Sequence, residues 1–524
     1  MSPNLAAVFS VHSPRLIRHS ACTALLAAGL VSAVLPISDA DAQNIVYRRV
    51  ALTGARMELN NGIVRLGSFG PPAISSSGAI AYRNIIYGQG IDASNADTII
   101  RQRGRSAEVL AQRFTRVRAG FITDGNMLLR KAPYDNRPNN TTDQVTFYFP
   151  YYTDFDSQVA IDEAGEVIFS SVTGLAATIV TTVTTGGAST STPARVNPFV
   201  DTLYATVGGI ATSAITKDWA YDPNAMNNFE LPVNSYGAGN MAFIGTRQVG
   251  GAGEVTGIFQ GTPFTFNPLA IIDRPVGGLP IGSTFSALEL PGINYGGILT
   301  TTATVNGPSS ALFQGIWTYD SAGEPSLLVG PTTEAPGSDG GTFSTITSRP
   351  WQSPTGQFVF TADVADSAEL TGGIFVGRMR NDGANRAIPN NLKLLLESDA
   401  LAPAKTVFSA DSVGEVTISN IQQPAINDRG TVVFQGTATG AGIVAGRNDS
   451  ALWAIVPRAE GVTRTPKPII RTGDRIRIDG RLQTVGVINF DPVYGLSRNN
   501  EVAFSVTFLN ARSGVFRAIL RPEK

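Results

Sequence analysis

Residues 427–434 read NDRGTVVF, and the same pattern recurs along the chain. A small polar residue is followed by two variable positions, glycine or asparagine, two more variable positions, a small or apolar residue and an aromatic. The clear copies are SSSGAIAY (75–82), DEAGEVIF (162–169), SPTGQFVF (353–360), NDRGTVVF (427–434) and SRNNEVAF (497–504), while NSYGAGNMAF (234–243) has two extra residues and NYGGILTT (294–301) lacks the aromatic. The copies end at positions 82, 169, 243, 301, 360, 434 and 504. Seven copies at such long intervals indicate a repeat architecture.

Each copy predicts a tight turn that leads into a strand. The first position is always Ser, Asp or Asn, whose side chain can bond the backbone two residues further on and nucleate a turn. The fourth position holds Gly in six copies and Asn500 in the seventh, and these residues best tolerate a positive φ. We therefore expect the aromatics and the tryptophans of the next strand to be core residues, namely Phe169, Phe360, Phe434, Phe504, Trp317 and Trp453.

Three more short strands follow each turn. The second strand has forms such as Gly-Ile-Phe at 257–259 and 373–375, and the third ends in a Gly- or Pro-rich turn. A fourth is seen in Thr-Phe-Ser at 284–286 and 342–344. Four short strands per repeat are typical of a propeller blade. The sequence predicts an all-β fold, a seven-bladed β-propeller of four-stranded blades.

The two ends of the propeller are predicted to meet in one blade. The last repeat has only its first two strands, while 50–54 and 64–69 look like third and fourth strands. Pairing N-terminal and C-terminal strands in one blade would close the ring, whereas an open solenoid needs polar caps. Residues 43–524 are predicted to form this single domain, with a long insertion at about 84–157.

The repeats resemble the tandem Asn-x-x-Gly-x-x-Ala-Phe repeats of bacterial exported proteins, and they are similar to the blade motif of TolB-like β-propellers. The resemblance covers nearly all of 43–524 and rests on seven copies, of which 294–301 departs by losing its aromatic. It implies a propeller fold and export from the cytoplasm. It implies no activity.

Residues 1–42 have the pattern of a signal peptide. Arg15 and Arg18 precede an apolar run at 21–37, and Ala40-Asp41-Ala42 gives a small-x-small cleavage pattern. The run is short for a membrane span, which needs about 20 apolar residues, and Pro36 interrupts it. We therefore expect a secreted or periplasmic protein with no transmembrane segment after cleavage of the signal.

Removal of the signal would also remove every histidine and cysteine, since these are His12, His19 and Cys22. Ser-His-Asp and Cys-His catalysis, His/Cys zinc sites and disulfides are then excluded. With 40 basic and 41 acidic residues the chain has no net basic field, so nucleic acid is not an expected partner.

No cofactor is predicted, and calcium is the one metal that the residue types allow. Acidic residues cluster at 162–166 and at 320–324, in Asp162, Glu163 and Glu166 and in Asp320 and Glu324. Neither cluster has the full spacing of a calcium loop. Simple turn chemistry is the preferred interpretation, and no metal site is predicted.

The predicted insertion holds the candidate site residues. The ligand-binding candidates are Arg101, Arg103, Arg105, Tyr148 and Tyr152, and the catalytic candidates are Tyr148, Tyr151, Tyr152 and Asp154. Exposed aromatic rings can stack on sugars, and arginines can bind uronic or sulfated acids. The alternation in 145–152 also fits an ordinary blade strand beside a solvated basic ribbon, and this alternative stays open.

Three functions remain compatible with these residues. The residue types favour binding over catalysis. The first is a binding or structural module of the cell envelope or extracellular medium, with a glycan or an envelope protein as partner. The second is a histidine-free carbohydrate-active enzyme, either a polysaccharide lyase using tyrosine as base or a glycosidase using two carboxylates. The third is a calcium-dependent lactone or ester hydrolase. The fold alone does not choose among them.

Overall fold

The computed structural model describes residues 45–59, 62–115, 117, 130–131, 142–183, 189–194, 199–207, 210–217, 226–229, 234–235, 241–249, 253–262, 265–277, 279–294, 296–308, 312–320, 323–367, 370–381, 387–409, 414–457 and 465–521. The predicted signal peptide, 1–42, lies outside them. All regular structure in the described residues is β-strand. They include no helix that is long and apolar enough to cross a membrane.

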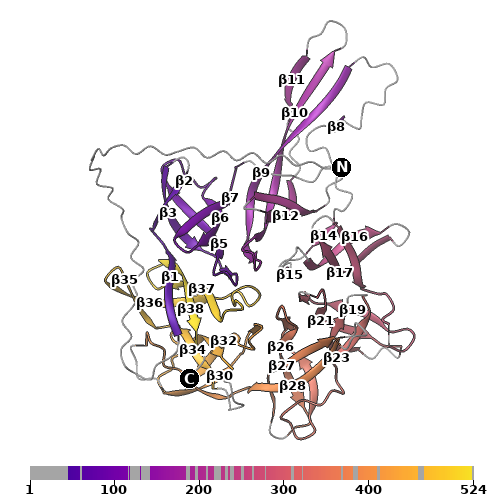
Figure 1. The fold of residues 1–524 in the computed structure, drawn as a ribbon, viewed down its shortest axis with the longest axis vertical. Coiled ribbons are helices and arrows are strands. Elements are labelled where there is room, and N and C mark those ends of the chain that lie inside the picture. Colours follow the sequence, from indigo (N-terminus) through magenta and orange to yellow (C-terminus); the bar gives the residue numbers. More distant parts are fainter. Residues whose placement is uncertain are drawn as a thin grey trace, which may run out of the picture. The chain divides into compact units, whose positions relative to one another are not determined.

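The strands form seven antiparallel sheets, which are the blades of a β-propeller (Figure 1). We number the blades along the chain. Blade 1 contains β2 (Arg56–Leu59), β3 (Gly62–Phe69), β4 (Ala73–Ile74), β5 (Ile80–Gly88), β6 (Asp97–Arg103) and β7 (Ser106–Gln112). Blade 2 contains β8 (Arg130–Lys131), β9 (Thr142–Ile161), β10 (Val167–Val183), β11 (Ser189–Ala194), β12 (Phe199–Val207) and β13 (Ile210–Thr216).

The next three blades follow in order. Blade 3 contains β14 (Asn228–Phe229), β15 (Asn234–Ser235), β16 (Met241–Val249), β17 (Gly253–Thr262) and β18 (Thr265–Ile271). Blade 4 contains β19 (Thr284–Leu288), β20 (Gly292–Ile293), β21 (Leu299–Asn306), β22 (Leu312–Tyr319) and β23 (Pro325–Val329). Blade 5 contains β24 (Thr342–Ile346), β25 (Trp351–Gln352), β26 (Gln357–Ala365), β27 (Gly372–Asn381) and β28 (Ala387–Glu397).

The last two blades hold the C-terminal part of the chain. Blade 6 contains β29 (Leu401–Pro403), β30 (Glu415–Ser419), β31 (Ala425–Ile426), β32 (Val432–Thr439), β33 (Ser450–Ile455) and β34 (Lys467–Arg471). Blade 7 contains β35 (Arg475–Ile478), β36 (Arg481–Asn489), β37 (Glu501–Phe508), β38 (Ser513–Leu520) and β1 (Ile45–Leu52).

The innermost strand of a blade is split into two parts. In blade 4, β19 and β20 both pair with β21, and in blade 5, β24 and β25 both pair with β26. The short second parts contact one another from blade to blade, as β15, β20, β25 and β31 do. The loop between the two parts therefore lies close to the propeller axis.

The strand β1 closes the ring. It pairs with β38 along its length, with Ile45 opposite Leu520 and Leu52 opposite Gly514. This confirms the predicted closure of N-terminal and C-terminal strands in one blade. The other segment expected there, 64–69, lies instead in β3 of blade 1, because a blade begins one strand earlier than the sequence repeat suggests.

The repeated turns have the predicted chemistry. In the copy at 427–434, the Asn427 Oδ1 accepts hydrogen bonds from the backbone N–H groups of Arg429 (3.0 Å) and Thr431 (3.1 Å). The bond four residues on recurs in other copies, for example from Glu166 N to Asp162 Oδ1 (2.8 Å). Gly430 has a φ of 74° and Asn500 a φ of 60°. The fourth position of the pattern therefore supplies a residue that tolerates a positive φ, and the first position supplies the side-chain acceptor that stabilises the turn.

The motif aromatics are core residues, as predicted. The motif positions Tyr82, Phe169, Phe243, Phe360, Phe434 and Phe504, together with Trp317 and Trp453, are all at most 1% exposed. In blade 5, Phe360 and Phe375 stack with ring centroids 5.6 Å apart, and Phe343 meets Phe375 edge to face at 4.8 Å. Each blade thus buries its inner and middle strands against its neighbours, which offsets the entropy of ordering the chain.

Turns of different blades are bonded to one another near the axis. The Ser76 N–H donates to Glu163 Oε2 (3.2 Å), and Asn499 Nδ2 donates to Ser76 O (2.7 Å). The Arg498 guanidinium pairs with Asp428 of the preceding blade. These contacts join blades 6, 7, 1 and 2 at the end of the propeller where the repeated turns lie.

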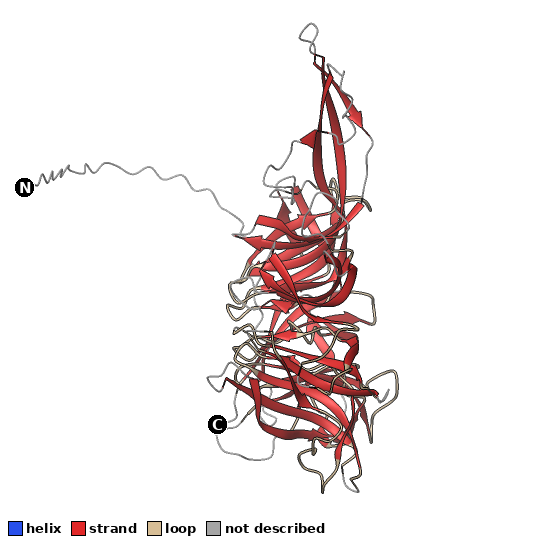
Figure 2. Cartoon of the chain, turned by 90° about the vertical axis from the view of Figure 1, so that its right-hand side faces the viewer, coloured by secondary structure: helices blue, strands red, loops and turns tan. Residues whose placement is uncertain are grey.

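Residues 84–157, expected to be an insertion, contain two regular strands of blade 1, β6 and β7. The strand pair β9–β10 of blade 2 is much longer than the strands of the other blades. These strands are 20 and 17 residues long and pair from Ile161 opposite Val167 to Thr142 opposite Val183. They extend well beyond the other sheets (Figures 1 and 2).

Candidate acidic pocket between blades 2 and 3

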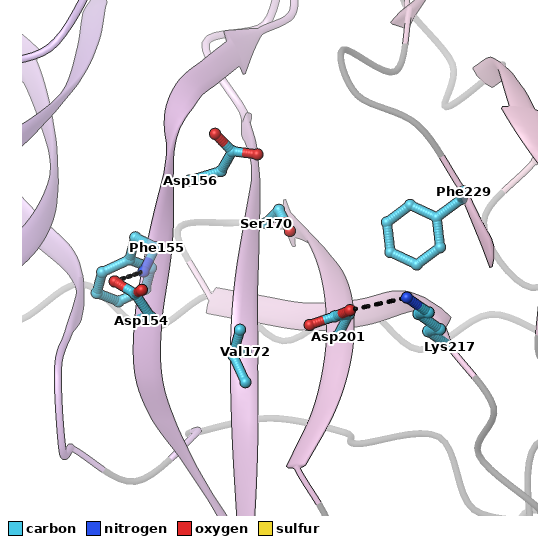
Figure 3. Close-up of a pocket in the computed structure, with 8 residues that line it drawn as sticks. All are labelled: Asp154, Phe155, Asp156, Ser170, Val172, Asp201, Lys217 and Phe229. Atoms are coloured by element: carbon cyan, nitrogen blue, oxygen red, sulfur yellow. Dashed lines mark hydrogen bonds and ion pairs between the residues drawn. The ribbon is translucent and has the colours of Figure 1, made fainter.

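A cavity of about 470 Å³ lies against the exposed face of blade 2, at its border with blade 3. We call it the acidic pocket. Its lining residues are Asp154, Phe155, Asp156, Ser170, Val172, Asp201, Lys217 and Phe229 (Figure 3). They come from β9, β10, β12, the end of β13 and β14.

Alternation after a register shift in β9 brings the carboxylates to this face. Asp154 and Asp156 are exposed on either side of the buried Phe155, and the shift between Tyr152 and Asp154 lets Tyr152 be buried as well. The buried rings pack in one cluster, with Tyr152 5.1 Å from Tyr204 and 5.4 Å from Phe155 between centroids. Because β9 is anchored by these aromatics on its inner face, its acidic side chains are held toward the pocket.

Three carboxylates and two cations set the charge of the pocket. Asp201 Oδ2 lies 3.5 Å from Lys217 Nζ, and Asp154 Oδ1 lies 3.6 Å from the Arg83 guanidinium of blade 1. Arg83 itself forms a two-nitrogen contact with Asp97, its shortest distance being 2.6 Å. The lining itself therefore holds three acidic groups and one lysine.

The pKa of Arg83 shows that several acidic side chains lie near its guanidinium. Burial lowers the pKa of its guanidinium, but the hydrogen bond to Asp97 and the charges of Asp97, Asp154 and Asp156 outweigh burial and raise the pKa. Asp154 and Asp156 therefore lie within electrostatic reach of one cation. A field of this kind favours ligands that donate hydrogen bonds and disfavours anions.

The tyrosine candidates occupy different places. Tyr152 is 2% exposed, and its ring packs in the aromatic core of blade 2. Tyr151 is half-buried, stacks on Phe114 at 6.0 Å between centroids, and lies over Gly174, where a Cβ would come within 2.5 Å of the ring. The side chain of Tyr148 lies outside the described residues. Of the three catalytic candidates whose side chains the structure describes, only Asp154 lines the acidic pocket.

The arginine candidates do not form one site. Arg101 is 4% exposed, and its guanidinium bonds Glu108 (2.8 Å), Glu166 (3.2 Å) and the carbonyl of Gly165 (2.9 Å). It thus links blade 1 to the turn of blade 2. Arg103 is exposed and donates to the same carbonyl at 3.3 Å, and Arg105 is exposed.

In the two acidic clusters considered for calcium, the aspartates accept hydrogen bonds from the backbone of their own turns. Asp162 Oδ1 accepts from Glu166 N, and Asp320 Oδ1 accepts from Glu324 N (2.9 Å). Burial raises the pKa of Asp162, and its backbone hydrogen bonds offset part of that rise. Among the described residues, no group of three or more His, Cys, Asp or Glu side chains is arranged to hold a metal ion.

Sequence reasoning missed Asp156, Asp201, Lys217 and Phe229 as members of one site. Asp156 carried a signal, because it stands two residues from Asp154 on the same strand face. The others carry no motif. They come from β12 and the end of β13, which pair in blade 2, and from β14 of blade 3, whose preceding segment forms the bridge Lys217–Met226 with the end of β13.

Known proteins give the following matches. A search of curated proteins finds none. Among solved structures, the chain is similar to the α-L-arabinofuranosidase of Fusarium graminearum (9% identity, TM-score 0.29, covering 78% of this chain and 98% of that chain). It is also similar to a luciferin-regenerating enzyme (10%, 0.24, 68% and 87%) and to Trypanosoma rangeli sialidase (9%, 0.24, 90% and 59%). TM-scores of this size carry no argument about a ligand or a reaction.

A family model matches residues 36–523, which is nearly the whole chain and all seven blades. Its description is a family of unknown function, DUF7453. The chain therefore belongs to the DUF7453 family.

Proposed function

We propose that the protein is an exported β-propeller that binds a neutral or amino-substituted glycan in the acidic pocket. The observation that carries this proposal is the lining of the pocket, which joins three carboxylates and an aromatic ring around a cavity of about 470 Å³. Cavities of about 300–1,000 Å³ are typical of small-molecule sites.

The chemistry of the lining suits a sugar. Carboxylates accept charge-assisted hydrogen bonds from hydroxyl or ammonium groups, and the lining contains three of them, Asp154, Asp156 and Asp201. Phe229 stands on the opposite side of the pocket from Asp154 (Figure 3). Its ring offers an apolar face to the C–H side of a sugar.

The same lining argues against uronic or sulfated ligands, which the arginines of the sequence suggested. Three carboxylates face one lysine, so an anionic sugar would meet like charge. The arginine that would have bound it, Arg101, is already engaged with Glu108 and Glu166. The ligand class therefore changes from acidic to neutral or amino sugars.

Export is part of the proposal and rests on the sequence of residues 1–42. The basic residues, the apolar run and the small-x-small pattern support cleavage near residue 42. A chain that loses Cys22 with its signal would need no disulfide chemistry outside the cytoplasm.

Glycoside hydrolysis is the second candidate function, because three carboxylates share one cavity. Such an enzyme needs a carboxylate pair about 5–10 Å apart across the scissile bond. Binding without turnover leaves the glycan intact, so product analysis separates the two functions.

Affinity measurements on variants test the binding site. We expect Asp201→Asn and Phe229→Ala each to weaken binding of a neutral or amino oligosaccharide by about 10-fold or more, since a hydrogen bond to a charged group contributes about 1.5–3 kcal/mol. Isothermal titration of residues 43–524 measures this. Asp339→Asn, at an exposed turn of blade 5, is the matched control and should bind as the wild type does. Equal affinities in all three variants would exclude the acidic pocket as the binding site.

A further inference from the structure

The charged side chains of the acidic pocket are accessible to a ligand. The side chains of Asp154, Asp201 and Lys217 are 62%, 43% and 35% exposed, and Asp156 is exposed as well. All four border the same cavity of about 470 Å³. The kind of group that this cavity attracts therefore depends on how much of its acidic charge the fold itself neutralises.

The two cations at the pocket are already engaged with carboxylates. The Arg83 guanidinium donates to both oxygens of Asp97, at 3.0 Å from Nε to Oδ1 and 2.6 Å from Nη2 to Oδ2. Arg83 lies farther from Asp154, at 3.6 Å. Lys217 Nζ lies 3.5 Å from Asp201 Oδ2. Each cation thus has a carboxylate partner before Asp154 and Asp156 are considered.

The pocket and its bordering ion pairs carry a net negative charge. Four carboxylates, those of Asp97, Asp154, Asp156 and Asp201, face two cations, Arg83 and Lys217, which leaves a net charge of −2. A ligand that carries only hydroxyl groups would cover these carboxylates without supplying a counter-charge, and desolvated charges without a partner are costly. A cationic group supplies the missing charge and is also attracted over a distance.

Asp154 and Asp156 define the place of the cationic group. They flank the buried Phe155 on β9, so both side chains lie on the exposed face of the strand. Residues two apart on a strand have Cα atoms about 7 Å apart. An ammonium group has three N–H donors, and it can donate to both carboxylates from a position between them.

Asp201 and Phe229 provide the rest of the binding surface, across the pocket from Asp154 (Figure 3). Phe229 is half-buried on β14, and its ring offers an apolar face to the C–H side of a sugar ring. Asp201 is held by Lys217 and can accept a hydrogen bond from a sugar hydroxyl. A simple alkyl diamine has the charge for Asp154 and Asp156 but lacks the hydroxyl for Asp201.

We propose that the acidic pocket selects glycans with free amino groups over neutral and N-acetylated glycans. The ammonium of a hexosamine unit binds Asp154 and Asp156, and its sugar ring lies against Phe229. This inference rests on the proposed function, because it narrows the ligand class of the same pocket. Acetylation of the amino group removes the positive charge and leaves the sugar ring unchanged, so the N-acetylated sugar is the matched comparison.

Titration with matched ligands tests the selection. Residues 43–524 are titrated calorimetrically with a glucosamine oligomer, its N-acetylated counterpart, a neutral cello-oligosaccharide and 1,4-diaminobutane, at one ionic strength. We expect the glucosamine oligomer to bind at least about 10-fold more tightly than the other three, because only this ligand combines charge-assisted hydrogen bonds with a sugar ring.

The possible outcomes separate this inference from the proposed function. Equal or tighter binding of a neutral or N-acetylated oligosaccharide would overturn the selection for free amino groups and leave glycan binding in place. Equal binding of 1,4-diaminobutane would show that the sugar ring is not recognised. No binding of any oligosaccharide would contradict the proposed function as well.

Two opposite changes of charge then locate the ammonium. Asp154→Asn and Asp156→Asn are each expected to weaken binding of the glucosamine oligomer by about 10-fold or more. Lys217→Gln is expected to tighten it several-fold, since it removes the only positive charge of the lining, and a gain of affinity cannot come from a loss of folding. Asp339→Asn, at an exposed turn, is the control for the loss of one negative charge. Unchanged affinity in both aspartate variants, or weaker binding in Lys217→Gln, would overturn the proposal.

Discussion

Asp474 and Asp491 are both buried aspartates close to an arginine, and they differ in how the fold satisfies them. Asp474 Oδ2 accepts from Thr406 Oγ1 (2.6 Å) and from the backbone N–H of Arg471 (2.9 Å), and its Oδ1 accepts from Ser409 Oγ (3.0 Å). Asp491 has donors on one oxygen only. Asp474 is therefore part of the structure that joins blades 6 and 7, whereas one buried oxygen of Asp491 has no hydrogen-bond partner among the described residues.

The arginines near these two aspartates, Arg471 and Arg349, also differ in their hydrogen bonds. Arg471 is fully buried and donates to the carbonyl of Asn448 (3.2 Å) in its own blade. Arg349 is less buried and has no such bond among the described residues. A buried charge that is hydrogen-bonded within the fold stabilises one arrangement of the chain.

The largest expected effect comes from removing the fully bonded acid. Asp474→Ala deprives two hydroxyls and a backbone N–H of their acceptor and removes a carboxylate that lies within electrostatic reach of Arg471. We expect a loss of about 3–5 kcal/mol in the free energy of unfolding, measured by urea denaturation. Asp339→Ala, at an exposed turn, is the control and should stay within about 0.5 kcal/mol of the wild type. A loss below about 1 kcal/mol for Asp474→Ala would remove the structural role assigned to this carboxylate.

A pH dependence of intermediate size follows from the same residue. Burial raises the pKa of Asp474 from 3.8 to about 6, and its hydrogen bonds and Arg471 offset part of that effect. Because the folded state holds this proton more tightly than the unfolded state, the contribution of Asp474 to stability is greatest below pH 3.8 and falls as the pH rises through 6. The change is of the order of 2–3 kcal/mol.

Denaturation curves across this range check the sign. The difference between wild type and Asp474→Asn should change between pH 4 and pH 6.5, because the amide does not titrate. The wild type should gain relative to the variant as the pH falls. A constant difference across the range would show that Asp474 does not titrate in it.

The smallest effect is expected at Asp491. In Asp491→Asn the amide oxygen can still accept from Val493 N and Tyr494 N, and the substitution removes the buried negative charge. We expect the free energy of unfolding to change by less than about 1 kcal/mol, and a gain is consistent with the account. Thermal and urea unfolding measure it at neutral pH. A loss above about 2 kcal/mol would mean that Asp491, like Asp474, is a structural acid.

The sequence was sufficient for the fold because its signal is local. Asn427, Gly430 and their counterparts encode a turn through bonds within five residues, and seven copies give the number of blades. The residue at which each blade begins was harder to predict from the sequence. It depends on β3 and β19 pairing with the strand that follows them, which the order of strands along the chain does not show.

The candidate site was only partly predictable. Asp154, selected as a catalytic candidate, lines the acidic pocket, whereas Tyr152 and Arg101 were selected from residue type, which does not reveal that both are buried. Arg101 lies opposite Glu108 in the β6–β7 pair and next to the turn of blade 2, so its charge is used within the fold. Asp201 and Phe229 are distant in sequence, and only the sheet arrangement brings them together.

The most direct test of the account is one titration of residues 43–524 with neutral, amino-substituted and uronic oligosaccharides, in which heats of binding are recorded and the recovered glycans are analysed by mass spectrometry. The account predicts binding of neutral or amino sugars, weaker binding or none of uronic sugars, and intact glycans afterwards. Cleaved glycans would show that the carboxylates of the acidic pocket act in hydrolysis. Binding of uronic sugars alone would contradict the charge argument on which the proposed function rests.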